Sequence, residues 1–504
     1  MKLSKLKFVV AIVLGTSVSS GAFAIDLYVN TKTKQIYSEP GPDRELLGSF
    51  VRVEDAPAKT ATPVLATPHN KSAELKAKAE NARLISKVDS LEEHIKKTKN
   101  IKVKLDNKGL QAETADGNFK FRIGGRIQAD ASVSSNDKFL KGGVPVEANN
   151  GTEVRRGRLA FSGTFFKDWN FISEIDFADN NVTVKDMKLN YSGLNFINAT
   201  VGQQKQAFSR ELQESSNDLM FIERSLMNVL NEPVVDRAIG VNLASHGKKW
   251  TGQAGVYGES IKSNKTSMDE GWGVSGRATY TPIAEETKLV HLGIAGNFRE
   301  PSDAGQISGS TSGASYSYET THMSDLFPIN SGVITSINNI KMLGLEANGV
   351  YGPFSVGGEY THSWMDRKMG MKSLGFHGWY GEASWTLTGE SRKYTKGKFK
   401  RLEPAREFSF ANGGLGAWEL AARVAGVDMN DGAFKGGSMK NFTVALNWYA
   451  NSNVRFMFGY DRILKIKNSP LTTVSGGKPD GLNTFMFRSQ IAFSFQLRNL
   501  AYDR

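Results

Sequence analysis

From Phe119 onward, polar and apolar residues alternate with a period of two over long stretches. Stretches around residues 120–130, 156–165, 442–448, 454–460 and 485–495 all follow this pattern. Side chains that alternate in this way belong to β-strands whose two faces meet different surroundings. The pattern therefore predicts an all-β domain for most of the chain.

Alternation alone fits both a soluble β-sandwich and a transmembrane β-barrel. The predicted strands are ~9–11 residues long, and their apolar faces carry Phe, Tyr and Trp toward the ends, as expected of a barrel with interfacial girdles. The stretch from Phe119 to Phe495 allows about 24 residues for each of 16 strands, enough for strand, turn and loop. We therefore expect a transmembrane antiparallel β-barrel of 16 strands over residues 100–504.

The first 71 residues contain a predicted export signal and a small N-terminal piece. Residues 1–24 combine three lysines, a short apolar run and the small-residue site Ala22-Phe23-Ala24, which together predict a signal peptide. Residues 25–71 start with a short alternating stretch and continue into an Ala/Thr/Pro-rich segment. We expect a small cap followed by an extended linker.

Residues 72–99 contain neither Gly nor Pro, and they show the spacing of a coiled coil. Leu84, Val88, Leu91 and Ile95 are separated by four, three and four residues, which places them on one seam of a helix. A short coiled coil is the preferred interpretation, and a helix packed on the main domain is the alternative. So short a seam is marginal alone, and we expect it to depend on oligomerisation of the neighbouring domain.

Composition excludes several classes of protein. The 504 residues include no Cys, which excludes disulfide scaffolds and thiol catalysis. The formal charge of +12 is compatible with nucleic acid, anionic lipid or small anions as partners, but the export signal argues against nucleic acid. The seven His show no pair at metal-ligand spacing, and there is no GxSxG nucleophile motif. We expect no enzyme activity, no cofactor and no metal.

Several segments resemble the phosphate-selective porin O/P family of Gram-negative outer membranes. The similar segments are FRIGGRIQAD at 121–130, EVRRGRL at 153–159, FSRELQESSNDLMFIERS at 208–225, WTLTGESRKY at 385–394, GAWELAAR at 416–423 and NWY at 447–449. The resemblance implies an outer-membrane trimer of 16-stranded barrels, with a periplasmic N-terminal coiled coil in many members. One departure is that residues 496–504 continue past Phe495, whereas such barrels usually end on an aromatic residue.

Basic residues on the inward strand faces are the candidates for anion binding. Alternation places Arg122, Arg126, Arg156 and Arg158 toward the lumen, where guanidinium groups match phosphate or carboxylate oxygens. The alternative is that these arginines pair with Asp130, Glu174 and Asp176 on neighbouring strands. The family resemblance adds Arg155 beside Arg156 at the narrowest point, although alternation points only Arg156 inward.

The segment from Lys205 to Glu223 is too polar and irregular for a strand, and we expect it to fold into the pore as a constriction loop. Lys205 and Arg210 are its basic candidates, because they are the only basic residues before Glu211. Four carboxylates make the loop net acidic: Glu211, Glu214, Asp218 and Glu223. Strict phosphate selectivity is therefore not implied.

Two functions remain open from the sequence. The leading hypothesis is a passive outer-membrane porin for small hydrophilic solutes that leans toward anions such as phosphate. The alternative is a structural outer-membrane protein with a closed barrel, which tethers the envelope through its coiled coil. Expected partners are outer-membrane lipid, two further copies of the chain, small anions, and periplasmic or cell-wall contacts of the coiled coil.

Overall fold

The computed structural model describes residues 25–30, 36–37, 39–50, 78–90, 101–261, 269–302, 305, 307 and 313–493. The chain divides into two compact units, Met1–Ser90 and Leu91–Arg504. The predicted signal peptide, Leu91, Ile95 and the residues after Phe493 lie outside the described residues. No helix in the described part of the chain is long and apolar enough to cross a membrane.

The described residues of the first unit form a small sheet and one helix. β1 (Ile25–Asn30) pairs antiparallel with β2 (Ile36–Tyr37) on one side and β3 (Arg44–Phe50) on the other. A helix covers residues 78–90, within the range predicted for the coiled coil, and every side chain on it is exposed. The coiled coil itself stays a prediction.

The second unit is a closed antiparallel barrel of 16 strands, which confirms the predicted fold class. Each strand pairs with the next one along the barrel. The last strand, β28, closes the barrel by pairing antiparallel with the first, β6, from Asn483↔Ser135 to Ala492↔Arg126. The strands are β6 (Lys120–Ser135), β9 (Gly151–Phe165), β10 (Trp169–Asp176), β11 (Thr183–Tyr191), β12 (Asn198–Lys205), β13 (Arg237–His246), β14 (Trp250–Tyr257), β15 (Trp272–Ala284), β16 (Lys288–Glu300), β19 (Ile337–Tyr351), β20 (Phe354–Arg367), β21 (Leu374–Thr386), β24 (Ala417–Asp431), β25 (Phe434–Tyr449), β26 (Val454–Lys467) and β28 (Asn483–Ala492).

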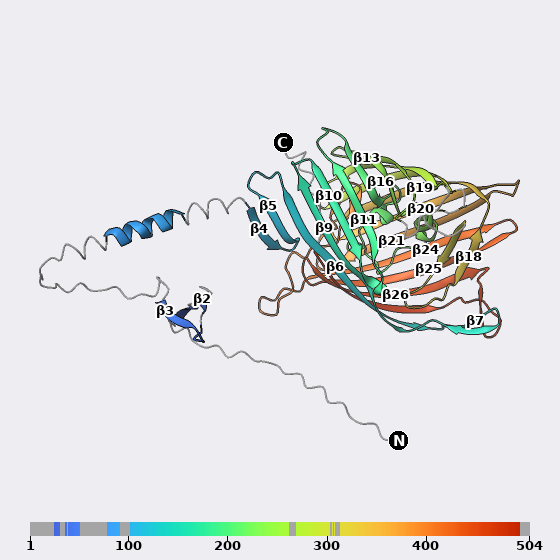
Figure 1. Cartoon of the computed structure of the whole chain (residues 1–504). Helices are drawn as coiled ribbons and strands as arrows, with labels where there is room; N and C mark the ends of the chain where they lie inside the picture. Colours follow the sequence, from blue (N-terminus) through green and yellow to red (C-terminus); the bar gives the residue numbers. More distant parts are fainter. Residues whose placement is uncertain are drawn as a thin grey trace, which may run out of the picture. The chain divides into compact units, whose positions relative to one another are not determined.

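Short strand pairs extend the barrel at both ends. The hairpin of β4 (Ile101–Asp106) and β5 (Gly109–Thr114) pairs with the start of β6. A small sheet joins β27 (Leu471–Thr473), β7 (Lys138–Lys141) and β8 (Val144–Glu147), and β17 (Ala314–Tyr318) pairs with β18 (Ile329–Ile334). Figure 1 shows β4 and β5 at one end of the barrel and β7 at the other.

The two ends of the barrel differ in the length of their connections. At the end that holds the start of β6, most connections are short turns, such as 166–168, 247–249, 285–287 and 352–353. At the other end lie the long connections 136–150, 206–236, 301–336 and 468–482. In outer-membrane barrels the short turns face the periplasm and the long loops face outward. We call these ends the turn end and the loop end; residues 387–416 are a long exception at the turn end.

The outward face of the wall is apolar and the inward face is polar. On β16 an outward row of five small or apolar residues runs from Val290 to Phe298, with Ile294 at its centre and Lys288 and Glu300 at its ends. The inward side chains of His291 and Arg299 on the same strand are fully buried. This arrangement suits a strand that faces hydrocarbon outside and a polar lumen inside.

Replacing Ile294 by Arg tests the position of the apolar band. Ile294 is 52% exposed on the outer face of the barrel, and an arginine at the middle of the bilayer costs about 2–4 kcal/mol. The control Val290→Arg, near the edge of the same row, should cost only about 0–1 kcal/mol. Denaturant titration of the protein folded into lipid vesicles measures both free energies of unfolding. Equal costs at the two positions would show that this face does not contact hydrocarbon.

Candidate functional site in the lumen

The connection between β12 and β13 folds into the barrel and crosses its lumen. This segment, residues 206–236, is called the lumen loop and contains α2 (Arg210–Gln213) and α3 (Asn228–Val235). Its backbone is bound by arginines of the opposite wall: Arg455 on β26 donates to the Leu219 carbonyl at 2.7 Å, and Arg488 on β28 donates to the Ile222 carbonyl at 2.6 Å. Asn447 of β25 also donates to the Met220 carbonyl, so the loop is held against the wall formed by β25, β26 and β28. The sequence predicted a constriction loop over Lys205–Glu223, and the structure extends it to residue 236.

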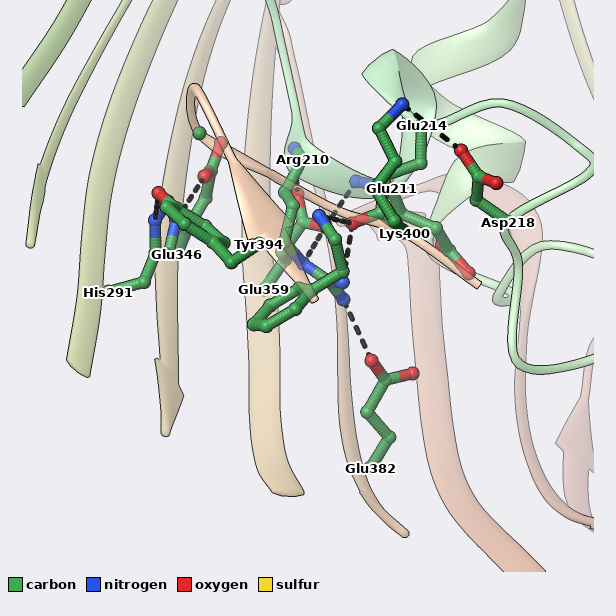
Figure 2. A network of polar contacts seen from close by, with 12 residues as sticks. Arg210, Glu211, Glu214, Asp218, His291, Glu346, Glu359, Glu382, Tyr394 and Lys400 are labelled. Atoms are coloured by element: carbon green, nitrogen blue, oxygen red, sulfur yellow. Dashed lines mark hydrogen bonds and ion pairs between the residues drawn. The ribbon is translucent and has the colours of Figure 1, made fainter. Parts of the chain in front are cut away.

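Arg210 anchors the start of the lumen loop. Its guanidinium is 1% exposed and contacts Glu214 at 2.9 Å and Glu382 of β21 at 2.8 Å (Figure 2). The Glu359 carboxylate of β20 accepts the backbone N–H of Arg210 at 2.9 Å. A buried arginine among paired carboxylates is held strongly in place, since removing one partner leaves an uncompensated buried charge. Arg210 was a candidate for anion binding at the constriction. The structure instead pairs it with carboxylates that hold the lumen loop in place, and it does not line the main cavity.

A second segment enters the lumen from the turn end. This turn-side insert, residues 387–416, carries the hairpin of β22 (Tyr394–Thr395) and β23 (Lys398–Phe399). The backbone N–H of Phe399 donates to Glu214 at 3.0 Å, and Lys400 contacts Asp218 at 3.3 Å. Two segments from opposite ends of the barrel therefore meet inside it, as Figure 2 shows for Lys400 and Asp218.

A chain of polar contacts fixes the turn-side insert to the wall. The Tyr394 hydroxyl lies 2.6 Å from Nδ1 of His291, and Nε2 of His291 lies 3.0 Å from the Glu346 carboxylate. Arg277 contacts the same carboxylate at 2.7 Å and donates to the Gly397 carbonyl at 2.8 Å. The hairpin tip is thus held next to β15, β16 and β19.

The space left open is a polar cavity along the β9–β15 side of the barrel. It has a volume of about 590 Å³. Its lining includes thirteen basic residues, Arg126, Arg155, Arg156, Arg158, Lys185, Lys188, Lys205, Arg224, Arg237, Arg277, Lys396, Lys398 and Lys400. Seven acidic residues also line it, Glu174, Asp176, Asp186, Glu214, Asp218, Glu232 and Asp236. We call this space the main cavity; its lining carries an excess of positive charge.

A second cavity of about 270 Å³ lies between the lumen loop and residues 317–322 of a loop-end connection. Arg155, Arg224 and Glu232 line both this cavity and the main one. Arg224 and Glu232 are themselves 3.8 Å apart. These three residues mark the place where the two cavities adjoin, which we call the neck.

A β-bulge brings both Arg155 and Arg156 to the lumen. In the pairing of β9 with β6, Arg156 lies opposite Gln128 and Val154 lies opposite Ala129, so Arg155 is the extra residue of the bulge. The alternation of a regular strand would point Arg155 outward, and a bulge re-aims one side chain. The two arginines, which the family resemblance nominated together, are therefore both inward.

Glu223 of the lumen loop occupies the space between these arginines. Its carboxylate contacts Arg155 at 3.0 Å, Arg156 at 3.4 Å and Arg488 at 2.8 Å. Burial opposes ionisation of Glu223, but the three arginines outweigh it and hold the pKa of this carboxyl well below its usual range. The carboxylate of the protein itself thus fills the position that an anion would take between these guanidinium groups.

The remaining arginine candidates are paired with strand carboxylates, as in the alternative considered from the sequence. Arg126 contacts Glu174 at 2.5 Å, and Arg158 contacts Glu174 at 2.9 Å and Asp176 at 2.7 Å. Asp130 pairs with Arg488 at 2.6 Å.

Arg122 lies outside the lining of the main cavity. It is half-buried near the turn end and donates to Gln111 of β5 at 2.8 Å. Its place is therefore beside the β4–β5 hairpin.

Three lysines of the main cavity have side chains that form no ion pair or hydrogen bond with any described residue: Lys185 of β11 and Lys396 and Lys398 of the turn-side insert. Burial lowers the pKa of Lys398 to about 7, and the neighbouring Lys400 adds repulsion in the same direction. Lys205, in contrast, donates to the carbonyls of Leu212 and Glu214 at 2.6 and 2.7 Å and so supports the lumen loop.

Sequence reasoning missed most of the cations in the main cavity. Arg277 lies on the inward face of β15, where the same alternation that identified Arg126 would have found it. Lys396 and Lys398 lie in a connection with no regular period, so only the folded position of the turn-side insert reveals them.

Comparison with known proteins gives a family match over residues 121–469, to the model described as phosphate-selective porin O and P. Porin O of Pseudomonas aeruginosa is 24% identical over 419 residues, which covers 76% of this chain and 91% of that protein. An uncharacterized protein of Caulobacter vibrioides is 29% identical over 358 residues, 68% of each chain. The anion-selective porin from Comamonas acidovorans aligns with a TM-score of 0.47 at 13% identity, over 74% of this chain and 100% of that chain.

Replacing Glu223 by Gln should increase the preference for anions. The change leaves Arg155, Arg156 and Arg488 without their shared carboxylate and adds one net positive charge beside the neck. A unit charge ~8 Å from a passing ion, at an effective dielectric of ~40, contributes about 1 kcal/mol, which screening at ~0.1 M salt reduces to about 0.5 kcal/mol. Because the charge stabilises chloride and destabilises potassium by this amount, the chloride-to-potassium permeability ratio changes by about 1 kcal/mol, or roughly fivefold. Reversal potentials in a KCl gradient across a planar bilayer measure this ratio.

The control for this change is Glu319→Gln, because Glu319 lines the second cavity but has no ion pair with any described residue. Both variants change the formal charge equally. If E223Q does not exceed E319Q in anion preference, the arginine cluster around Glu223 does not face the ion path.

Proposed function

This chain belongs to the phosphate-selective porin O and P family, and we propose that anions cross its barrel along the lysines of the main cavity. It is a porin of the Gram-negative outer membrane that passes small hydrophilic solutes passively and leans toward anions. The protein is therefore a channel rather than an enzyme. The lysines of the main cavity are the groups to which we assign the preference for anions.

The observation that carries this proposal is the difference between paired and unpaired cations. Arg126 and Arg158 have their charge balanced by Glu174 and Asp176 at contact distance. Lys185, Lys396 and Lys398 line the same cavity without such a partner among the described residues. An unbalanced ammonium attracts a passing anion, while each single site stays weak enough to release it.

The cargo we propose is small anions in general, with phosphate among them. Acidic residues such as Asp186 and Asp218 line the main cavity, and Glu232 lines the neck. Negative charge along the path lets cations enter as well, so the expected preference is graded. This supports the wider solute range over strict phosphate selectivity.

The alternative of a closed barrel that only tethers the envelope is less well supported. A barrel that serves only as a tether needs no polar space, yet the main cavity of about 590 Å³ adjoins a second cavity at the neck. Absence of ohmic current steps in a planar bilayer would favour the tether.

Removing the three unpaired lysines tests the proposal. In the variant K185Q/K396Q/K398Q we expect the chloride-to-potassium permeability ratio to fall at least about fivefold, because each ammonium changes this ratio by on the order of 1 kcal/mol. Since the pKa of Lys398 is about 7, the wild type should prefer anions more strongly at pH 6 than at pH 8. Reversal potentials at ~0.1 M KCl measure both effects, because screening there is still modest.

The control variant K102Q/K108Q/K167Q removes three exposed lysines outside the lining of the main cavity, with the same change in net charge. It should keep the wild-type ratio and the wild-type pH response. If the lumen variant behaves like this control while remaining inserted and conducting, the lysines do not set the selectivity.

We also propose that three copies of the chain associate and that the helix over residues 78–90 packs against its copies on the periplasmic side. Leu84 and Val88 are 55% and 52% exposed, although they are apolar and share a heptad seam. Packing against other copies would cover them.

Replacing Leu84 and Val88 by Ser should weaken this association without closing the pore. We expect lower yields of cross-linked oligomer from the isolated outer membrane and an unchanged single-channel conductance, because the described residues that line the main cavity all belong to the second unit. The control A79S/A82S changes helix residues off the seam. Loss of conductance in a correctly inserted L84S/V88S variant would show that the N-terminal unit takes part in the channel.

A further inference from the structure

Four basic side chains lie on the outward face of the barrel, on β25 and β26 near the loop end. Lys440, Arg462, Lys465 and Lys467 are all exposed. Charged side chains on the outward face of an outer-membrane barrel cost free energy unless they lie near the membrane surface or have a partner. The positions of these four residues therefore call for a physical explanation that the channel does not supply.

The strand register gives their depth in the membrane. On β25 the outward side chains run from Trp448 through Leu446, Val444 and Phe442 to Lys440. Eight residues at ~3.3 Å per residue and a tilt of ~40° span roughly 20 Å, close to the height of the apolar band of such barrels. Trp448 thus marks the edge of the band at the turn end, and Lys440 marks its edge at the loop end.

An aromatic side chain confirms this level independently. Trp379 of β21 is aligned with Gly426 of β24, Gly426 with Lys440, and Lys440 with Lys465 of β26, so the row runs across four adjacent strands. The ammonium of Lys440 lies 5.8 Å from the centre of the Trp379 ring. Tryptophans of this kind form the girdle at the headgroup level. Lys440 and Lys465 are therefore at the headgroup level of the outer leaflet, whereas Arg462, aligned with Phe442, lies one row deeper and Lys467, aligned with Ser438, one row farther out.

The row contains an electrostatic conflict that an anion would resolve. Lys440 and Lys465 are direct cross-strand partners, and like charges directly opposite each other destabilise a sheet. A register shift at this point adds Leu464 to β26 and leaves both Lys465 and Lys467 exposed.

No carboxylate of the described residues forms an ion pair with any of the four cations. The outward Asp428, aligned with Ser438, bonds to Asn430, and Asp480 accepts the backbone N–H of Ile466. Arg462 donates only to the side chain of Asn483, at 3.2 Å. Positive charge is thus concentrated here, and none of the four cations has an ion-pair partner among the described residues.

We propose that these four residues form a binding site for the phosphate groups of a glycolipid in the outer leaflet. A phosphate monoester carries close to two negative charges and several acceptor oxygens, which suits two ammonium groups flanked by a guanidinium. Its sugar would lie at the level of Trp379 and its acyl chains along the apolar rows below. This site is on the outside of the barrel and is independent of the proposed anion path through the lumen.

Thermal unfolding with and without purified glycolipid tests the site. Wild-type protein in detergent should be stabilised by lipopolysaccharide, and the variant K440Q/K465Q should bind it at least about tenfold more weakly, since each charge-assisted hydrogen bond is worth 1.4 kcal/mol or more. Without lipid the variant should be as stable as the wild type or more stable, because the like-charge pair is removed. An unchanged thermal stability without lipid would show that the variant is folded, so that weaker stabilisation by the glycolipid reports weaker binding.

The control K341Q/K372Q removes two basic side chains at the loop end that are already paired: Lys341 of β19 with Asp366 at 2.8 Å, and Lys372 of the connection between β20 and β21 with Asp431 at 3.2 Å. This control should bind like the wild type. Dephosphorylated glycolipid should not stabilise any of the proteins. Three results would overturn the proposal: equal stabilisation by the dephosphorylated lipid, equal binding by K440Q/K465Q, or the same K440- and K465-dependent effect from inorganic phosphate. A variant that loses oligomerisation but binds the lipid normally would assign this face to contacts between copies instead.

Discussion

The buried ion pairs of Arg210 are the interaction on which the interior of this barrel depends. A barrel of 16 strands encloses a wide aqueous lumen, and its wall alone cannot make a narrow path. Arg210 ties the start of the lumen loop to Glu382 of the wall and to Glu214 of the loop itself. Glu214 in turn accepts the backbone N–H of Phe399, so the same cluster positions the turn-side insert. Both segments that narrow the lumen therefore depend on one buried network.

The basic residues of the lumen divide into two groups with different physical roles. Arginines such as Arg455 and Arg488 bind backbone carbonyls of the lumen loop, because a guanidinium offers several donors in a fixed plane. The unpaired lysines Lys185 and Lys398 instead present a compact charge to the cavity. The arginines thus build the path, and we assign the preference for anions to the lysines.

Alternation along the strands was sufficient to predict the barrel and the inward direction of Arg126 and Arg158, because a two-residue period follows from strand geometry alone. It could not predict that Arg155 also turns inward, since one extra residue in a bulge breaks the period. Pairing was also out of reach: Arg488 and Asp130 meet only because the last strand closes on the first. The position of the turn-side insert likewise depends on contacts between residues far apart in the sequence, such as Arg277 with Gly397 and Phe399 with Glu214.

The sign of the reversal potential of the wild-type channel tests the central claim most directly. Purified protein would be inserted into a planar bilayer of neutral lipid across a roughly tenfold KCl gradient, with ~0.1 M on the dilute side so that screening remains limited. The excess of basic residues along the main cavity predicts that chloride crosses faster than potassium, which makes the dilute side negative at zero current. A dilute side that becomes positive would contradict the account, because it would show that the carboxylates of the lumen govern the path.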